Sequence, residues 1–503
     1  MYWHEGRLLY AVTHFSVSEL IIGQFNPNQL GGAIDTLVSS GYHLTKILHL
    51  QLLELLTSIP STAETQLIIG SIASFLAIAA CGLCVRGTLK EIGFARETAN
   101  WSVVAFFLMP CIPYLAGKLL AEVSALLPAF AALWLWSHCL KTGLRASFVK
   151  ALIVSVLVTI TALARLDIVI AHIGFVAATV YATRAGTRAQ LLRLHGFVCG
   201  AAGLLYIVVI AGSDGSFSSI TAYFSNYLSL HPKSLPMSVF GLASFGGLMW
   251  VFAIAGSFMR AELKFPILIW LLICLVPIAG IVSNYMIEPR YLIASAMPFA
   301  ALAGISLQRF FRALQSDLTR NSAIVLIALI APANALPVAL MPYEIDRKSI
   351  LEVADTYAGA DADSALLVSW SYTDFHFLRY ARPDANIFNV HSPRGDPGSL
   401  SREWDNRLRS WYGDRYITDN EALAEIEGRG SIFYLGWGVY PPVETLQLWA
   451  RYFGLDSLGD GIARLRLLVH EEQSWLWADN RHELKPIASH GRYNVYKVHK
   501  AHP

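Results

Sequence analysis

Long apolar segments alternate with short polar loops over the middle of the chain, from about residue 66 to residue 341. A helix needs roughly 20 mainly apolar residues to cross a bilayer core about 30 Å thick. Ten segments meet or approach that length, so we expect a mostly α, polytopic bundle of about ten spans. The segments cover residues 66–85, 101–117, 119–138, 149–164, 168–183, 196–212, 236–258, 265–283, 291–308 and 322–341.

The loops between these segments fall into two classes that alternate along the chain. One class is rich in basic residues: Arg86, Lys90, Arg96, Lys141, Arg145, Lys150, Arg184, Arg188, Arg193, Arg260, Lys264, Arg309, Arg312 and Arg320. The other class holds only Lys118, Arg165, Lys233 and Arg290. Because basic loops stay in the cytoplasm, the first class is predicted to be cytoplasmic and the second class to face outward.

The stretch 149–183 has no Gly or Pro break near its middle and could be drawn as one long helix. Both of its ends carry basic loops, however, and these must lie on the same side of the membrane. We therefore predict a helical hairpin that turns at Arg165, Leu166 and Asp167.

Two flanking regions are predicted to be exported. Residues 343–503 follow the last span and fall on the outer side, which in a bacterial inner membrane is the periplasm. Residues 1–65 are assigned to the same side as a first exported loop with juxtamembrane helices. Since no apolar span precedes them, we expect either a first transmembrane helix ahead of Met1 or a short tail that crosses unaided.

The overall composition supports a membrane protein. The chain is 55% hydrophobic and 15% charged, whereas soluble globular proteins have nearer a quarter charged residues. The net charge of +2 gives no reason to expect nucleic acid as a partner. Cys81 and Cys84 have CxxC spacing inside an apolar segment, where small core residues are expected rather than a metal or redox pair.

The region 343–503 mixes strand and helix signals and is predicted to be a soluble α/β domain. Short buried strands are expected at 365–370, 385–390, 431–437, 463–469 and 494–498. Helices are expected at 347–357, 419–427 and 442–453. Its sequence contains no Gly-rich phosphate loop, nucleophile elbow or metal-spaced His/Cys cluster. The chemistry is therefore expected in the transmembrane bundle, 66–342, and the loops on its outer side.

Ionisable residues at membrane depth are costly and are functional candidates by default. Lys118 and Glu122 are four residues apart at the start of one span, which would place them on one helical face. Arg165 and Asp167 lie at the predicted hairpin. Pro289 suits a helix start, where free N–H groups and Arg290 would form an anion site.

Each candidate also has a structural interpretation. Lys118 and Glu122 could be a simple intrahelical ion pair. Arg165 and Asp167 could only punctuate a turn, and Arg290 could anchor a lipid headgroup. In the first loop, His43 is more often structural than functional, and composition alone cannot judge Glu5.

Five segments, taken in order, resemble the GT-C membrane glycosyltransferases, which include protein O-mannosyltransferases and the aminoarabinose transferase. They are residues 3–10 (WHEGRLLY), 41–50, 113–122, 162–165 and 290–298. In the first segment His4 stands where the first acid of the family's acidic pair usually stands, and Glu5 where the second does. In the second segment, around His43, the prolines of the family pattern are absent.

This resemblance implies transfer of a sugar from a polyprenyl-phosphate donor to a hydroxyl of a lipid, polysaccharide or protein acceptor. The leaving group is already an anionic phosphate, so it needs charge stabilisation. Lys118, Arg165 and Arg290 would hold it, with His4, His43, Asp167 and Tyr291 nearby. A carboxylate would deprotonate the acceptor, Glu5 first and Glu122 second, and the anomeric centre would invert. A divalent metal is possible but not demanded.

Three alternatives stay open. A secondary transporter is less expected, because its internal repeats are not evident and a 160-residue exported tail would be unusual. A catalytically inactive protein that binds lipid-linked sugar is compatible with His4. An O-antigen ligase or polymerase type would also use a polyprenyl carrier.

Overall fold

The structure is a computed structural model of the chain. It describes residues 3–21, 43–143, 147–183, 187–213, 216–229, 242, 244–259, 263–282, 289–314, 316–317, 319, 321–325, 347–358, 364–369, 372–391, 416–418, 431–437, 482–491 and 493–500. Their contacts divide the chain into two units, one formed by residues 37–52 and 67–339 and the other by residues 1–36, 53–66 and 340–503. The first loop, expected as one segment, is thus divided between the units.

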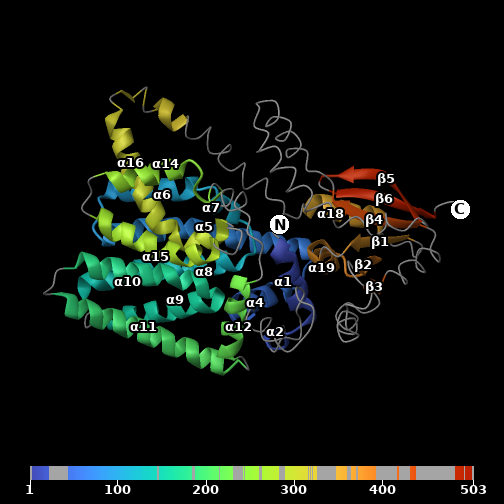
Figure 1. Cartoon of the computed structure of the whole chain (residues 1–503), viewed down its shortest axis with the longest axis horizontal. Helices are drawn as coiled ribbons and strands as arrows, with labels where there is room; N and C mark the ends of the chain where they lie inside the picture. The colour runs from blue at the N-terminus through green and yellow to red at the C-terminus, as the bar shows by residue number, and fades with distance from the viewer. Residues whose placement is uncertain are drawn as a thin grey trace. The chain divides into compact units, whose positions relative to one another are not determined.

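The first unit is a bundle of apolar helices (Figure 1). Its elements are α4 (Ile47–Thr57, shared with the other unit), α5 (Ala63–Glu91), α6 (Arg96–Leu108), α7 (Cys111–Leu115), α8 (Ala121–Thr142), α9 (Phe148–Ala164), η1 (Leu166–Val169), α10 (Ile170–Ala182), α11 (Arg188–Ala211), α12 (Phe217–Ser229), α14 (Met249–Phe258), α15 (Lys264–Val282), η3 (Pro289–Ser295) and α16 (Ala296–Ala313). Among the described residues, four helical stretches are long and apolar enough to cross a membrane: Ala63–Glu91, Ala121–Thr142, Arg188–Ala211 and Arg290–Ala313.

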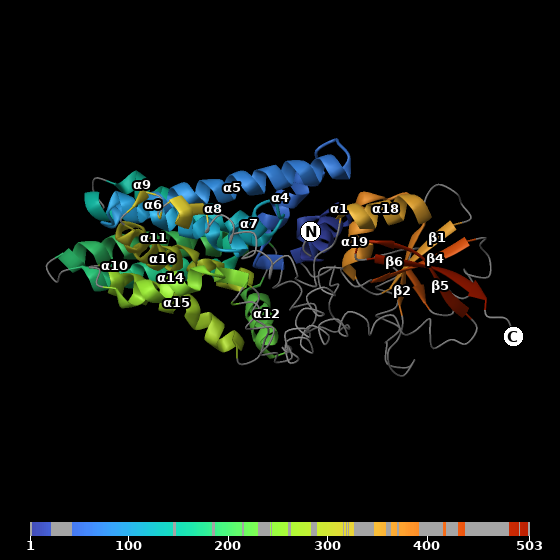
Figure 2. The same ribbon diagram turned by 90° about the horizontal axis from the view of Figure 1, so that it is seen from above.

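The bundle is built around α16. This helix packs against α6 on one side and α14 on another, and almost all of its residues are buried. Close approach is possible because two glycines lie at the contacts: a Cβ on Gly304 would be 2.7 Å from Ser102 Cα, and one on Gly256 would meet the backbone of Leu302. Neighbouring pairs α8–α9, α9–α11 and α10–α15 complete the packing (Figure 2).

The predicted hairpin is present. α9 ends at Ala164, Arg165 has an extended conformation, and η1 leads into α10. The single span expected at 101–117 is wrong, because the chain breaks between α6 and α7. Pro110 explains the break, since proline disfavours helical geometry in the residue before it, and Met109 is extended. The last predicted span, 322–341, lies largely outside the described residues.

The second unit contains a six-stranded sheet with helices packed on it (Figure 2). Its elements are α1 (Trp3–His14), α2 (Val17–Ile21), α18 (Arg347–Tyr357), β1 (Ser364–Ser369), α19 (Tyr372–Ala381), β2 (Ile387–His391), β3 (Tyr416–Thr418), β4 (Ser431–Trp437), β5 (His482–His490) and β6 (Tyr493–Lys500). The strand order is β3-β2-β1-β4-β6-β5. The first four are mutually parallel, while β6 is antiparallel to β4 and to β5.

The α/β prediction is therefore correct, and the strands expected at 365–370, 385–390, 431–437 and 494–498 are present as β1, β2, β4 and β6. β5 was not predicted, because its sequence is polar and contains Pro486, which lies at a register irregularity of the kind where an edge strand tolerates proline. The strand and helices expected at 463–469, 419–427 and 442–453 lie outside the described part of the chain.

Candidate active site

Glu122 lies at the centre of the candidate site, and its position there follows from where α8 begins. Gly117 has φ +89°, a conformation that favours glycine, and Leu120 is extended before the helix begins at Ala121. Glu122 consequently lies in the first helical turn, where free N–H groups and the helix dipole stabilise a carboxylate. Its side chain is 1% exposed, so its charge must be balanced by protein groups.

Arg165 provides the first balancing charge. It follows the last residue of α9 and is 7% exposed. Its Nη1 donates to Glu122 Oε1, while Nε and Nη2 donate to Asp167 Oδ1 at 2.7 Å and Oδ2 at 3.0 Å. The two-point contact with Asp167 fixes the plane of the guanidinium group.

Arg290, in η3, provides the second balancing charge for Glu122. Its Nη1 is 3.6 Å from the same Glu122 Oε1, and its side chain is also buried. Its Nη2 donates to the hydroxyl of Tyr291 at 3.2 Å. The Tyr291 ring lies near both guanidinium groups, 5.1 Å from Arg290 Cζ and 5.8 Å from Arg165 Cζ, at which a cation–π attraction operates.

Three further residues, not among the sequence candidates, lie in the same region. His49 of α4 is 2% exposed, and its Nδ1 is 2.9 Å from Ser124 Oγ on α8. Its Nε2 is buried with no hydrogen-bond partner among the described residues. Lys46 adds positive potential at both Glu122 and His49. The signal that could have identified this segment was Lys46 in the mainly apolar run 44–57, which also contains His49 and Glu54.

Positive charge exceeds negative charge among the described residues of this cluster. Arg165, Arg290 and Lys46 are positive and Glu122 and Asp167 are negative, which leaves one positive charge in that set. The arginines are buried and oriented by carboxylates. Such a cluster is suited to binding an anion with planar, directional donors.

The expectation that Lys118 and Glu122 share a helical face is wrong. Lys118 lies before α8 begins, and its ammonium group is 4.9 Å from the centre of the Tyr114 ring. The ion pairs of Glu122 among the described residues are with Arg165 and Arg290 instead. The extended residues before Ala121 cause this difference, because they take Lys118 out of helical register.

The remaining candidates are placed as follows. His43 is 2% exposed and lies just ahead of α4, in the helical bundle unit. His4 and Glu5 lie in the first turns of α1, in the other unit, and their side chains are outside what the structure describes. Within the described residues, no group of three or more His, Cys, Asp or Glu side chains has an arrangement that could hold a metal ion.

Comparison of the sequence with protein-family models and with curated proteins gives no match. Comparison of the structure with solved structures does give matches. ArnT from Cupriavidus metallidurans, in a crystal structure bound to undecaprenyl phosphate, aligns with a TM-score of 0.51 and 13% identity, over 98% of this chain and 97% of that one. The chain has the GT-C fold. The archaeal oligosaccharyltransferase AglB from Archaeoglobus fulgidus aligns less well, with a TM-score of 0.47 and 11% identity, over 86% of this chain and 65% of that one.

The GT-C fold accounts for the two-unit architecture, a membrane helix bundle and a C-terminal α/β domain, that the sequence predicted. It also agrees with the resemblance found in the ordered motifs. At 13% identity the likeness is one of fold.

Proposed function

We propose that this chain is a glycosyltransferase that moves a sugar from a polyprenyl-phosphate donor to an acceptor hydroxyl at the outer, periplasmic face of an inner membrane. The observation that carries the proposal is the cluster of Arg165 and Arg290 around Glu122, at the ends of apolar helices. A polyprenyl phosphate is an anion attached to a long apolar tail. Its binding site must therefore offer fixed positive charge beside a surface that lipid can reach.

The fold supports the same ligand class. The ArnT structure with this fold contains undecaprenyl phosphate, and the present cluster has the excess positive charge that a phosphate needs. The sugar and the acceptor, whether lipid, polysaccharide or protein, stay open in the proposal.

In the proposed reaction, the acceptor oxygen attacks the anomeric carbon while the bond from that carbon to the phosphate oxygen breaks. The phosphate leaves with the bonding electron pair, and Arg165, Arg290, Lys46 and Lys118 stabilise its charge. The acceptor proton passes to a carboxylate. A single displacement of this kind inverts the anomeric centre.

The contacts of Glu122 favour a positioning role for it. Its Oε1 is already shared by two guanidinium groups, so loss of this carboxylate would misorient the phosphate-binding arginines. Glu5 is then the preferred general base, and His4, His43 and Tyr291 are proposed to line the site. These roles predict different defects: a variant of Glu122 should lose the orientation of the phosphate-binding arginines, and a variant of Glu5 should lose the general base.

Binding is tested with the full-length protein in nanodiscs and undecaprenyl phosphate. Arg290→Ala should weaken binding by about 10- to 100-fold, the range for a hydrogen bond to a charged group. Arg312→Ala is the matched control, because Arg312 is an exposed arginine at the far end of the same helical stretch, paired with Glu97. Equal affinity in both variants would refute the assigned phosphate site.

Transfer is tested with radiolabelled polyprenyl-phosphate sugars and lipid, polysaccharide and peptide acceptors. Glu5→Gln should abolish transfer while leaving undecaprenyl phosphate bound, whereas Glu19→Gln, an exposed glutamate of the neighbouring helix α2, should leave both unchanged. Donor binding without any transfer by the unmodified protein would instead identify a protein that only binds lipid-linked sugar. Uptake of sugar into sealed vesicles without transfer would identify a transporter.

A further inference from the structure

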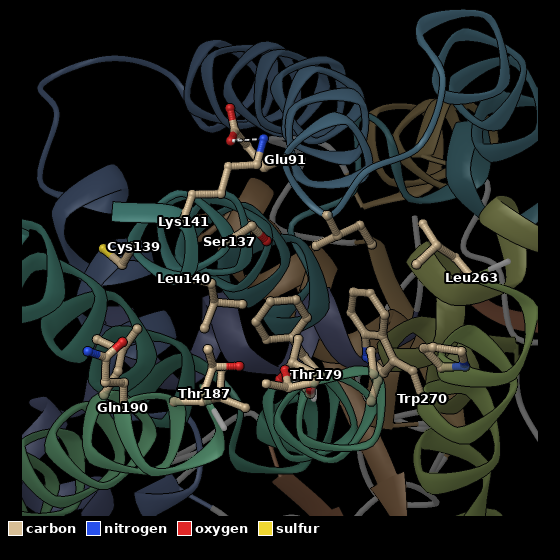
Figure 3. A pocket seen from close by; sticks show the side chains of 18 of the residues that line it. Glu91, Ser137, Cys139, Leu140, Lys141, Thr179, Thr187, Gln190, Leu263 and Trp270 are labelled. Carbon is tan, nitrogen blue, oxygen red and sulfur yellow. Dashed lines mark hydrogen bonds and ion pairs between the residues drawn. The ribbon is translucent and has the colours of Figure 1, made fainter. Parts of the chain in front are cut away.

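A cavity lies at the end of the helix bundle away from the candidate active site. Its volume is about 460 Å³, within the range of small-molecule sites, and it lies among α8, α10, α11 and α15, with the end of α5 at its edge (Figure 3). Helix α8 runs from the candidate active site to this cavity, because Glu122 is in its first turn and Lys141 is in its last turn. At 1.5 Å per residue, these positions are about 30 Å apart, which is the thickness of a bilayer core.

The inner wall of this cavity is apolar. Phe175, Ile267 and Trp270 line it and are almost completely buried. Trp270 is held in place by its indole N–H, which donates to Ala171 O at 2.8 Å. A hydrocarbon chain could lie against this wall without leaving a polar group unsatisfied.

The cavity lining also carries hydrogen-bonding groups. Thr179, Thr183, Thr187 and Gln190 follow one another from the end of α10 to the start of α11 and all line the cavity. Thr187 and Gln190 are exposed, whereas Thr179 lies deeper, 3.0 Å from His195 Nε2. These hydrogen-bonding groups therefore become more exposed from Thr179 to Thr187.

The mouth is basic. Lys141 lines it and pairs with Glu91 at 3.0 Å, as Figure 3 shows. Arg188 directly follows the lining residue Thr187, and Lys264 directly follows Leu263. Among these four charged residues only Lys141 and Glu91 line the cavity, and the basic Arg188 and Lys264 flank it in the sequence. The loops at this end are those that the positive-inside rule assigns to the cytoplasm, where anionic lipids attract basic side chains.

From this arrangement we propose that the cavity binds one anionic phospholipid of the adjoining, cytoplasmic leaflet. An acyl chain lies against Phe175, Ile267 and Trp270, and the phosphate lies at the mouth beside Lys141. The apolar inner wall suits a ligand with a tail, and Lys141, with the basic residues that flank the mouth, suits an anionic headgroup. The site is separate from the proposed transfer site and does not depend on that reaction.

The test uses the full-length protein in phosphatidylcholine nanodiscs that contain a small fraction of a photoactivatable phosphatidylglycerol, with the reactive group on the acyl chain. Cross-linked peptides should map to α10 and α15. A phosphatidylcholine probe of the same chain length should label them several-fold less. Glycerol 3-phosphate, which has the anionic head without the tail, should not compete.

Two variants test the two halves of the proposal. Lys141→Ala should lower labelling about fivefold, the effect of one basic residue near a charged lipid surface. Ala182→Trp places a large side chain at an exposed position on the cavity wall and should abolish labelling. Lys90→Ala removes an exposed lysine at the same end of the bundle that does not line the cavity and should have no effect.

Several results would overturn the proposal. They are equal labelling by both probes, labelling spread evenly around the bundle, competition by glycerol 3-phosphate, and unchanged labelling in Ala182→Trp. Thermal unfolding of each variant, compared with that of the unmodified protein, shows whether a loss of labelling reflects a loss of fold.

Discussion

The carboxylate of Glu122 is the point at which the candidate site is most sensitive to change. Glu122→Gln keeps the shape of the side chain and removes its charge. Arg165 and Arg290, both less than 10% exposed, then lose the carboxylate that they share. The variant therefore tests whether this buried cluster is held together as the structure shows.

The expected loss of stability follows from burial. Removing one partner of a buried ion pair costs about 3–5 kcal/mol, because the remaining charge stays buried without compensation. Arg165 keeps its two contacts with Asp167, at 2.7 and 3.0 Å. We therefore expect the lower end of this range, about 3 kcal/mol, which is a factor of about 150 in the unfolding equilibrium.

The cysteines provide an assay specific for the bundle. All six lie between residues 81 and 274, and five of them are buried, so a thiol-reactive fluorescent dye reports unfolding of this unit as temperature rises. Cys199 is exposed and contributes a constant baseline. Glu122→Gln should lower the transition temperature by several degrees.

Glu97→Gln is the control, since it makes the same chemical change in an exposed ion pair with Arg312. Exposed ion pairs contribute little, so its transition should stay close to that of the unmodified protein. If the two variants shift equally, or if Glu122→Gln does not shift, Glu122 is not the buried charge partner described here.

Two further changes test one unit each. Gly304→Ala should destabilise the bundle by about 1–3 kcal/mol through overpacking, since the added methyl group meets Ser102 of α6. Gly200→Ala in α11 is the control, because nothing lies within 4 Å of the added methyl group, and it should not destabilise the bundle. Equal unfolding transitions of the two variants in the dye assay would contradict the contact between Gly304 and Ser102. In the α/β unit, hydrogen bonds from Arg382 lower the pKa of Asp355. Their stabilisation is present at neutral pH and is lost as pH falls through the lowered pKa, below about 4. Hydrogen exchange of α18 should therefore be faster in Asp355→Asn than in the unmodified protein at pH 7, with a difference that shrinks in acid. Asp384→Asn, at an exposed position, should show no such difference.

Features that depend on local pattern were predictable from the sequence. Apolar length marked the helices, and the alternation of basic loops located the hairpin turn at Arg165 without any Gly or Pro signal. Short β-rich runs marked β1, β2, β4 and β6, because each is buried within the sheet. These features follow from residues close together along the chain and from the solvent that surrounds them.

Features that depend on approach between distant segments needed the tertiary structure. The partners of Glu122 come from positions 165 and 290 rather than from Lys118, because extended residues before α8 shift the helix start. His49 enters the cluster through Ser124, 75 residues away. Residues near the N-terminus belong with the α/β unit, where α1 packs against α19. Hydrophobic pattern determines which residues are buried, but packing geometry determines which buried charges and polar groups meet.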